Sequence, residues 1–286
     1  MPSPPEVLED EHEVKDGEGE QEQGASEDAA GVVEPEPADR RTVTAPLPLD
    51  WTRIHKEQEI EAKVVRYPWT VSEIDIEDDE LCIVGTAGKK VTNMGKLGEH
   101  CNPNLKKLIL RSNLVKTMEG LGDFEELELL ELYDNMVEAL TALDEGPNGA
   151  PGFTLKVLDM SYNVIRDMRP VSMCPNLREL YLANNKLKTI DGLSELKSLV
   201  KIDLGANKIR VMEGLDGLVN LEELWLGKNK IEMIQGIEKL TKLRRLDVQS
   251  NRLTVVANLE SQKDTLEELY LDANRISELP RVRKLI

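Results

Sequence analysis

The sequence predicts an α/β solenoid, in which a short unit is stacked on copies of itself and a parallel β-sheet lines one side. One pattern, L-x-L-x-x-N, recurs eight times between residues 108 and 274. Its asparagines are 22 residues apart in five of the seven intervals, and 28 and 23 apart in the other two. Aromatic residues make up only 3% of the chain, so the interior is aliphatic. A unit this short cannot bury a core alone, and its copies must stack.

Each pattern predicts one short strand. In the copy LYLANN, Leu180 and Leu182 point to the same face of an extended chain, and Tyr181 points to the other. The leucines therefore face the core and position 181 faces outward. A worn copy, LCIVGT, precedes the others, with Thr86 in the asparagine position.

The asparagines that end the strands are expected to form an internal ladder. An amide side chain both donates and accepts hydrogen bonds, so it can pair with the backbone groups that become exposed where a strand turns. Losing one such side chain costs about 1–3 kcal/mol, because buried backbone groups are left unpaired. The predicted ladder consists of Asn113, Asn135, Asn163, Asn185, Asn207, Asn229, Asn251 and Asn274.

Beyond each asparagine, apolar residues recur at every third position, as in Leu187, Ile190 and Leu193. A step of three fits 3₁₀ turns better than an α-helix with 3.6 residues per turn. We therefore expect an outer side of short 3₁₀ segments with some α-helix. The whole unit is that of a leucine-rich-repeat horseshoe with 22-residue repeats and a concave parallel sheet.

Composition divides the chain into three regions. Residues 1–50 carry 15 acidic and 3 basic side chains and few bulky apolar ones, so we expect a disordered acidic tail. Residues 51–79 form a linker, in which 50–65 could be a short helix that ends before Pro68. Residues 80–286 form the repeat domain, and its Gly/Pro-rich insertion DEGPNGAPG is expected to be a surface loop.

Several classes of function are disfavoured. A net charge of −18 argues against a nucleic-acid partner, because phosphate contacts require Lys and Arg. No apolar run reaches the roughly 18 residues of a membrane span, and the N-terminus lacks the features of a signal peptide. Three scattered cysteines cannot build a disulfide framework, in keeping with the nucleus and cytoplasm. We expect a monomer that acts through a protein partner.

No catalytic or cofactor site is evident. His12, His55 and His100 have no metal-ligand spacing to a cysteine or carboxylate. The segments GTAGKK and MGKL resemble parts of a phosphate loop but lack its full spacing and its Ser or Thr. Cys101 and Cys174 are more simply packing thiols than nucleophiles. We therefore expect no enzyme, no metal and no cofactor.

The concave face is the candidate binding surface. Residues between the two core positions of each strand form one row: Ile109, Glu131, Asp159, Tyr181, Asp203, Trp225, Asp247 and Tyr270. A second row, two residues earlier, includes Lys107, Glu179, Lys201, Glu223, Arg245 and Glu268. Large aromatics beside carboxylates are typical of protein interfaces. The alternative is that they are only β-favouring residues on an exposed strand.

Three segments, ELYDN (131–135), LGKNKI (226–231) and QSNRLT (249–254), together with the 22-residue unit, resemble the protein phosphatase 1 regulatory subunit 7 family. The resemblance covers about residues 80–279. It implies a concave face that binds the phosphatase catalytic subunit through alternating acidic and aromatic residues. By position, this row corresponds to Asp159, Tyr181, Asp203 and Trp225. Neighbouring contacts would be Glu131, Glu179, Glu223, Asp247 and Tyr270.

The resemblance also implies differences from other phosphatase regulators. The family does not depend on a short basic-Val-x-Phe docking peptide, and KVVRY at 63–67 is only a near match. Its repeats continue further and end in a cap, whereas this sequence stops twelve residues after Asn274, so we expect a C-terminally truncated member.

The leading hypothesis is a non-catalytic subunit that controls the activity or localisation of protein phosphatase 1. The alternative is a leucine-rich-repeat scaffold of an axonemal or ribonucleoprotein assembly.

Overall fold

The computed structural model describes residues 79–87, 90–95, 97–98, 101–143 and 151–277, all within the compact unit Ile60–Ile286. The predicted acidic tail, nearly all of the 51–79 linker with its possible helix, and the KVVRY segment lie outside these residues. So do the three histidines, most of the DEGPNGAPG insertion and residues 278–286, where the expected truncation falls.

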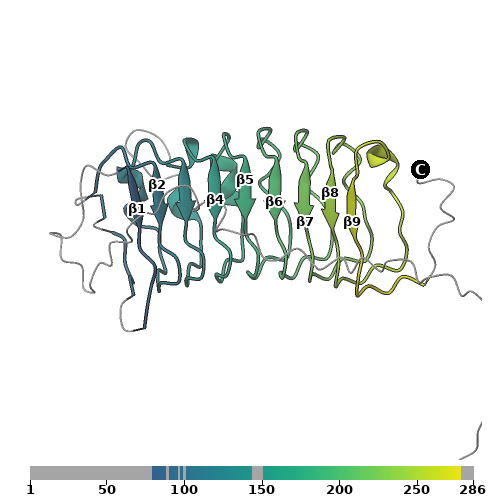
Figure 1. Ribbon diagram of the computed structural model, residues 1–286, viewed down its shortest axis with the longest axis horizontal. Coiled ribbons are helices and arrows are strands. Elements are labelled where there is room, and N and C mark those ends of the chain that lie inside the picture. Colours follow the sequence, from purple (N-terminus) through teal and green to yellow (C-terminus); the bar gives the residue numbers. More distant parts are fainter. Residues whose placement is uncertain (1–78, 88–89, 96, 99–100, 144–150, 278–286) are drawn as a thin grey trace, which may run out of the picture. The chain divides into compact units, whose positions relative to one another are not determined.

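Nine short strands form one parallel sheet, in which each strand pairs with the next along the chain (Figure 1). The predicted parallel solenoid is thereby confirmed, and the worn copy LCIVGT supplies the first strand. The strands are β1 (Glu80–Cys82), β2 (Lys107–Ile109), β3 (Leu129–Glu131), β4 (Val157–Asp159), β5 (Glu179–Tyr181), β6 (Lys201–Asp203), β7 (Glu223–Trp225), β8 (Arg245–Asp247) and β9 (Glu268–Tyr270).

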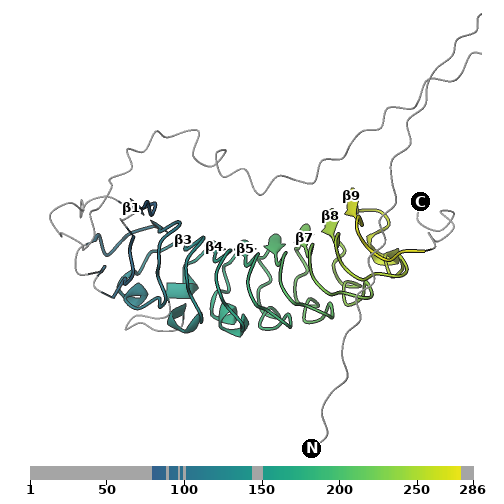
Figure 2. The same cartoon turned by 90° about the horizontal axis from the view of Figure 1, so that it is seen from below.

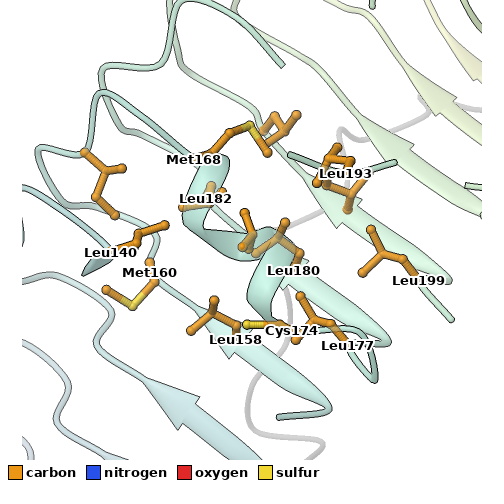
Figure 3. Close-up of a cluster of buried hydrophobic side chains, with 14 of the residues drawn as sticks. Leu140, Leu158, Met160, Met168, Cys174, Leu177, Leu180, Leu182, Leu193 and Leu199 are labelled. Carbon is orange, nitrogen blue, oxygen red and sulfur yellow. The ribbon is translucent and has the colours of Figure 1, made fainter. Parts of the chain in front are cut away.

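The core runs along the solenoid as one continuous aliphatic cluster. In the coil that contains β5, Leu180 and Leu182 are fully buried. Figure 3 shows them together with Leu193, Leu199 and Cys174, which come from the outer turns. Each coil contributes two strand residues and its every-third-residue leucines, so stacking buries what a single coil would expose.

An asparagine lies four residues after the last residue of each strand from β2 to β9. Asn185 Nδ2 donates to the carbonyl oxygens of Met160 in the preceding coil (2.9 Å) and Leu182 (3.1 Å). Its Oδ1 accepts a hydrogen bond from the Ile165 N–H (3.0 Å). The residue before the asparagine has a left-handed backbone, with φ 52° at Asn184, and this conformation turns the chain out of the strand.

The outer side contains no α-helix among the described residues, so the expectation of some α-helix there was wrong. Short 3₁₀ segments are present: η2 (Leu121–Asp123), η3 (Thr141–Leu143), η4 (Pro151–Phe153), η5 (Arg169–Met173) and η6 (Glu260–Gln262). The coils between β5 and β8 have single turns instead, such as Leu196 N–H to Leu193 O (3.0 Å). A strict apolar step of three cannot line one face of a 3.6-residue helix, so the chain crosses the outer side in turns. Figure 2 shows the strands on the inner side of the arc and the turns on the outer side.

Two described cysteines are packing groups. Burial raises the pKa of the Cys101 thiol to about 11 and that of the Cys174 thiol to about 12. Among the described residues, no helix is both long and apolar enough to cross a bilayer.

Candidate functional site

Three rows of side chains cover the concave face of the sheet. The inner row is the third residue of each strand, and the register places its members in adjacent pairs, such as Asp159 with Tyr181 and Asp203 with Trp225. The leading row lies two residues earlier and the trailing row two residues later, on the same face. The trailing row, which the sequence analysis did not consider, contains Arg111, Tyr133, Ser161, Ala183, Gly205, Gly227, Gln249 and Asp272.

All nine predicted contact residues lie in the inner and leading rows, but their exposure differs. Asp159 is 1% and Tyr181 2% exposed, and Glu131 and Asp247 are also buried. Partly buried are Glu179, Asp203, Glu223, Trp225 and Tyr270. Tyr181 is not a member of the aliphatic core cluster, and its hydroxyl donates to Glu179 Oε2 in the leading row (2.6 Å). Its burial is therefore a property of the concave face.

The inner-row aspartates share one local arrangement. Oδ1 of Asp203 accepts a hydrogen bond from the N–H of Gly205 two residues later, at 2.8 Å. Asp159 and Asp247 make the same bond to Ser161 and Gln249, also at 2.8 Å. The carboxylates thus satisfy a backbone donor at the strand end.

Burial disfavours the ionised form of these carboxyl groups. Desolvation raises the pKa of Asp159 to about 7 and that of Asp203 to about 6. Oδ2 of Asp159 is buried without a hydrogen-bond partner. The concave face therefore has two carboxyl groups that would gain from a cation brought by a partner.

Lys201 joins the two central aromatics. Its Nζ lies 5.9 Å from the ring centroid of Tyr181 and 6.0 Å from that of Trp225. It also pairs with Glu223 at 2.9 Å, and Trp225 Nε1 donates to the same carboxylate at 3.1 Å. Desolvation opposes ionisation of Glu223, but the hydrogen bond and charge of Lys201 overcome it and lower the pKa. Sequence reasoning had seen Lys201 only as a member of a row.

The C-terminal end of the face carries a charged network. Arg245 pairs with Glu223 at 2.7 Å and with Glu268 at 2.9 Å. The rings of Trp225 and Tyr270 stack across β8 with centroids 5.7 Å apart. These contacts hold the exposed edges of both aromatics in fixed positions.

The N-terminal end is built around Arg111 in the trailing row. Its Nε pairs with the buried Glu131 at 2.6 Å, and its guanidinium lies 5.7 Å from the ring centroid of Tyr133. Tyr133 in turn contacts Tyr162, with centroids 4.9 Å apart. The period of two, continued one step past the inner row, was the signal that could have identified Arg111 and Tyr133.

Comparison with known proteins identifies the repeats. The family model described as Leucine Rich repeats (2 copies) matches residues 154–195, 175–219 and 219–261. The 187-kDa microtubule-associated protein AIR9 of Arabidopsis thaliana is 31% identical over 106 residues. This alignment covers 36% of the chain but only 6% of that protein.

Solved structures share the fold. An internalin of Listeria monocytogenes superposes with a TM-score of 0.61 at 22% identity, over 72% of this chain and 64% of the internalin chain. A chain of an octameric complex of Latrophilin 3, Unc5D and FLRT2 gives 0.60 at 20% identity, over 71% of this chain and 62% of that chain. At such identities the likeness concerns the fold alone.

Proposed function

Because the chain is a leucine-rich-repeat protein, we propose that it is a non-catalytic regulatory subunit that binds the catalytic subunit of protein phosphatase 1 through its concave face. The observation that carries the proposal is the in-register order of acid, aromatic, acid and aromatic along β4 to β7. The sequence resemblance described above supplies the identity of the partner. Control of phosphatase activity or localisation follows from occupation of the catalytic subunit by this surface.

The geometry suggests that the aromatic and acidic residues of the concave face would make different contacts with the partner. Trp225 is partly buried and is held by Lys201 and Glu223, so it would offer rigid apolar surface at low entropic cost. Tyr181 is only 2% exposed, and its ring supports Lys201 from the neighbouring strand. Gly205 and Gly227 occupy the trailing row beside Asp203 and Trp225, which leaves that part of the face without bulky side chains. A Lys or Arg of the partner would then reach Asp203, which is the partly buried aspartate of the row.

This arrangement makes binding dependent on pH. A partner cation near Asp203 favours the carboxylate, whereas the free chain holds its pKa at about 6. Binding would therefore release protons, and affinity should rise as the pH increases from about 5 to about 7.5.

The test is retention of the purified phosphatase catalytic subunit by the full chain. The double substitution Trp225→Ala and Asp203→Ala should reduce affinity at least about tenfold, because it removes an aromatic anchor and a charged contact. A matched control, Val219→Ala with Asp216→Ala, changes two exposed residues on the outer side and should leave affinity unchanged. Equal retention by both variants would refute the proposed surface.

A second candidate is a scaffold in an axonemal or ribonucleoprotein assembly. The similarity to a protein named as microtubule-associated favours the cytoskeletal form of this alternative. Co-sedimentation of the full chain with microtubules, in the absence of retention by the phosphatase, would select it.

A further inference from the structure

A second regular row of side chains runs along the flank that follows the strands. From Met136 on, the residue that follows each asparagine donates its N–H to a backbone carbonyl of the preceding coil. The acceptor is the residue two positions after the asparagine of that coil. Lys208 N–H to Leu187 O and Lys230 N–H to Ile209 O are both 2.8 Å. These bonds stack the flank residues coil upon coil, at roughly the 5 Å spacing of parallel strands. The row reads Leu114, Met136, Val164, Lys186, Lys208, Lys230, Arg252 and Arg275.

The chemistry of this row changes from apolar to basic at Lys186. Neighbouring positions in the same coils add further cations. We name this surface the basic ridge; it comprises Arg166, Lys186, Lys188, Lys208, Arg210, Lys228, Lys230, Arg252 and Arg275. All are partly or fully exposed. Within the described residues, the only ion pair of the ridge joins Arg252 and Glu232, at 3.9 Å.

The ridge is basic although the protein as a whole has a net charge of −18. Cations on an acidic protein normally find carboxylates nearby, as Lys201 and Arg245 do on the concave face. A run of like charges at the spacing of adjacent coils is mutually repulsive, so it offers favourable energy to a bound anion.

An apolar ribbon accompanies the ridge. Four residues after the asparagine, three successive coils expose Val211 (41%), Met233 (50%) and Val255 (44%). Exposed apolar residues that recur at one position of successive coils indicate a contact surface more strongly than scattered ones do.

We propose that the basic ridge and its apolar ribbon bind an acidic polypeptide segment that carries apolar side chains between its carboxylates. Carboxylates would pair with the lysines, and the apolar side chains would cover Val211, Met233 and Val255. Along the ridge, the one aromatic side chain next to an asparagine is Tyr162, in the coil of Arg166. Successive bases of a nucleic acid would therefore find no continuous stacking surface. A nucleic acid or an anionic membrane would also extend over the acidic remainder of the protein and be repelled. A short acidic peptide avoids both difficulties.

The proposal is tested with the full chain and a fluorescent peptide in which pairs of glutamates alternate with single leucines. The fourfold variant Lys186→Gln, Lys208→Gln, Lys230→Gln, Arg252→Gln should weaken binding at least about tenfold in fluorescence anisotropy. The matched control removes four cations outside the ridge, by Lys197→Gln, Lys239→Gln, Lys242→Gln and Lys263→Gln. It should change affinity less than about threefold, although the net charge changes equally.

Two further variants separate the contributions. Replacing Val211, Met233 and Val255 with serine should weaken binding of the glutamate–leucine peptide severalfold. The same replacement should have little effect on binding of a peptide of glutamate and glycine. Reversal of the four ridge charges to glutamate should abolish binding of the acidic peptide and permit binding of its lysine counterpart. Circular dichroism of the charge-reversed variant checks that it is folded.

Several results would overturn the proposal. Equal weakening by the ridge and control variants would mean that only net charge matters. Tighter binding of single-stranded DNA or of phosphatidylserine vesicles than of the peptide would assign the ridge to another class of partner. Retention by the phosphatase through Trp225 and Asp203 is a separate measurement, so the two proposals can fail independently.

Discussion

The concave face and the basic ridge arise from the same repeat but differ in whether their charged side chains are paired. On the concave face, Lys201, Glu223 and Arg245 pair with one another, and Asp159 is buried. On the ridge, Lys208 and Lys230 have no ion pair within the described part of the chain. The first surface is organised before a partner arrives, whereas the second holds uncompensated charge.

This difference has consequences for recognition. A face on which most charged side chains are already paired gains affinity mainly from desolvated anchors, and such contacts depend weakly on salt. A ridge of unpaired cations acts through screened Coulomb attraction, which declines over a Debye length of about 8 Å at physiological ionic strength. One repeat can therefore carry two surfaces with different modes of recognition, one before and one after the asparagine that follows the strand.

The largest expected effect is loss of that shared asparagine. Asn207 Nδ2 donates to Leu182 O (2.9 Å) and Leu204 O (3.0 Å), and its Oδ1 accepts from Leu187 N–H (3.0 Å). Asn207→Ala should lower the free energy of unfolding by about 3 kcal/mol, because several buried backbone groups lose their partners. Asn220→Ala should cost less than about 1 kcal/mol, because the Asn220 side chain bonds only one backbone carbonyl, that of Lys197, and the solvent-accessible Lys242. Urea unfolding of both variants measures the difference, and equal losses would contradict the ladder's role.

The next effect concerns the buried carboxyl group of Asp159. Its folded pKa of about 7 lies above its unfolded value, so the native state binds more protons and stability falls as the pH rises from about 4 to about 7. Asp159→Asn should raise stability at pH 8 by about 1–3 kcal/mol and flatten this slope.

Asp167 provides a control of opposite sign in the same coil. Its hydrogen bonds to Arg169 lower its pKa, so its contribution is present at neutral pH and is lost as the pH falls through the folded pKa. Asp167→Asn should therefore reduce stability at pH 8. Thermal unfolding across the pH range distinguishes the two, and a parallel change in both variants would show that the burial of Asp159 has no electrostatic cost.

The sequence was sufficient to predict the features that depend on the spacing of the repeats. A period of 22 predicted the parallel stack, and a period of two placed Tyr181 and Trp225 on one face with the aspartates. It could not predict that Tyr181 is 2% exposed, since that depends on how side chains of adjacent coils pack. The role of Lys201 escaped notice for the same reason, because its partners lie in other coils.

The sequence also contains the basic ridge, which the sequence analysis did not consider. The residues that follow successive asparagines change from apolar to basic in the printed sequence, as Val164, Lys186 and Lys208 show. The left-handed residue before each asparagine has no common side chain, with Ala206, Lys228 and Ser250 in successive coils, so composition could not reveal it. A backbone conformation imposed by stacking leaves little trace in residue type.

A smaller effect is expected from Lys201. Lys201→Met removes the cation beside the rings of Tyr181 and Trp225 and the 2.9 Å pair with Glu223. We expect a loss of about 1 kcal/mol in unfolding free energy and weaker retention by the phosphatase, with no change in binding of the acidic peptide. Lys201→Arg should restore most of the stability. A loss of peptide binding in Lys201→Met would show that the two surfaces are not independent.

The smallest effect has the opposite sign. Lys208→Gln with Arg210→Gln removes two exposed cations from the middle of the basic ridge, next to Lys186 and Lys230 in the stack. Relief of like-charge repulsion should stabilise the protein by a few tenths of a kcal/mol at low ionic strength, and salt of about 0.5 M should abolish the gain. Thermal unfolding at two salt concentrations measures it. A loss of stability that persists in high salt would mean that these side chains have structural partners, and the ridge would then resemble the concave face.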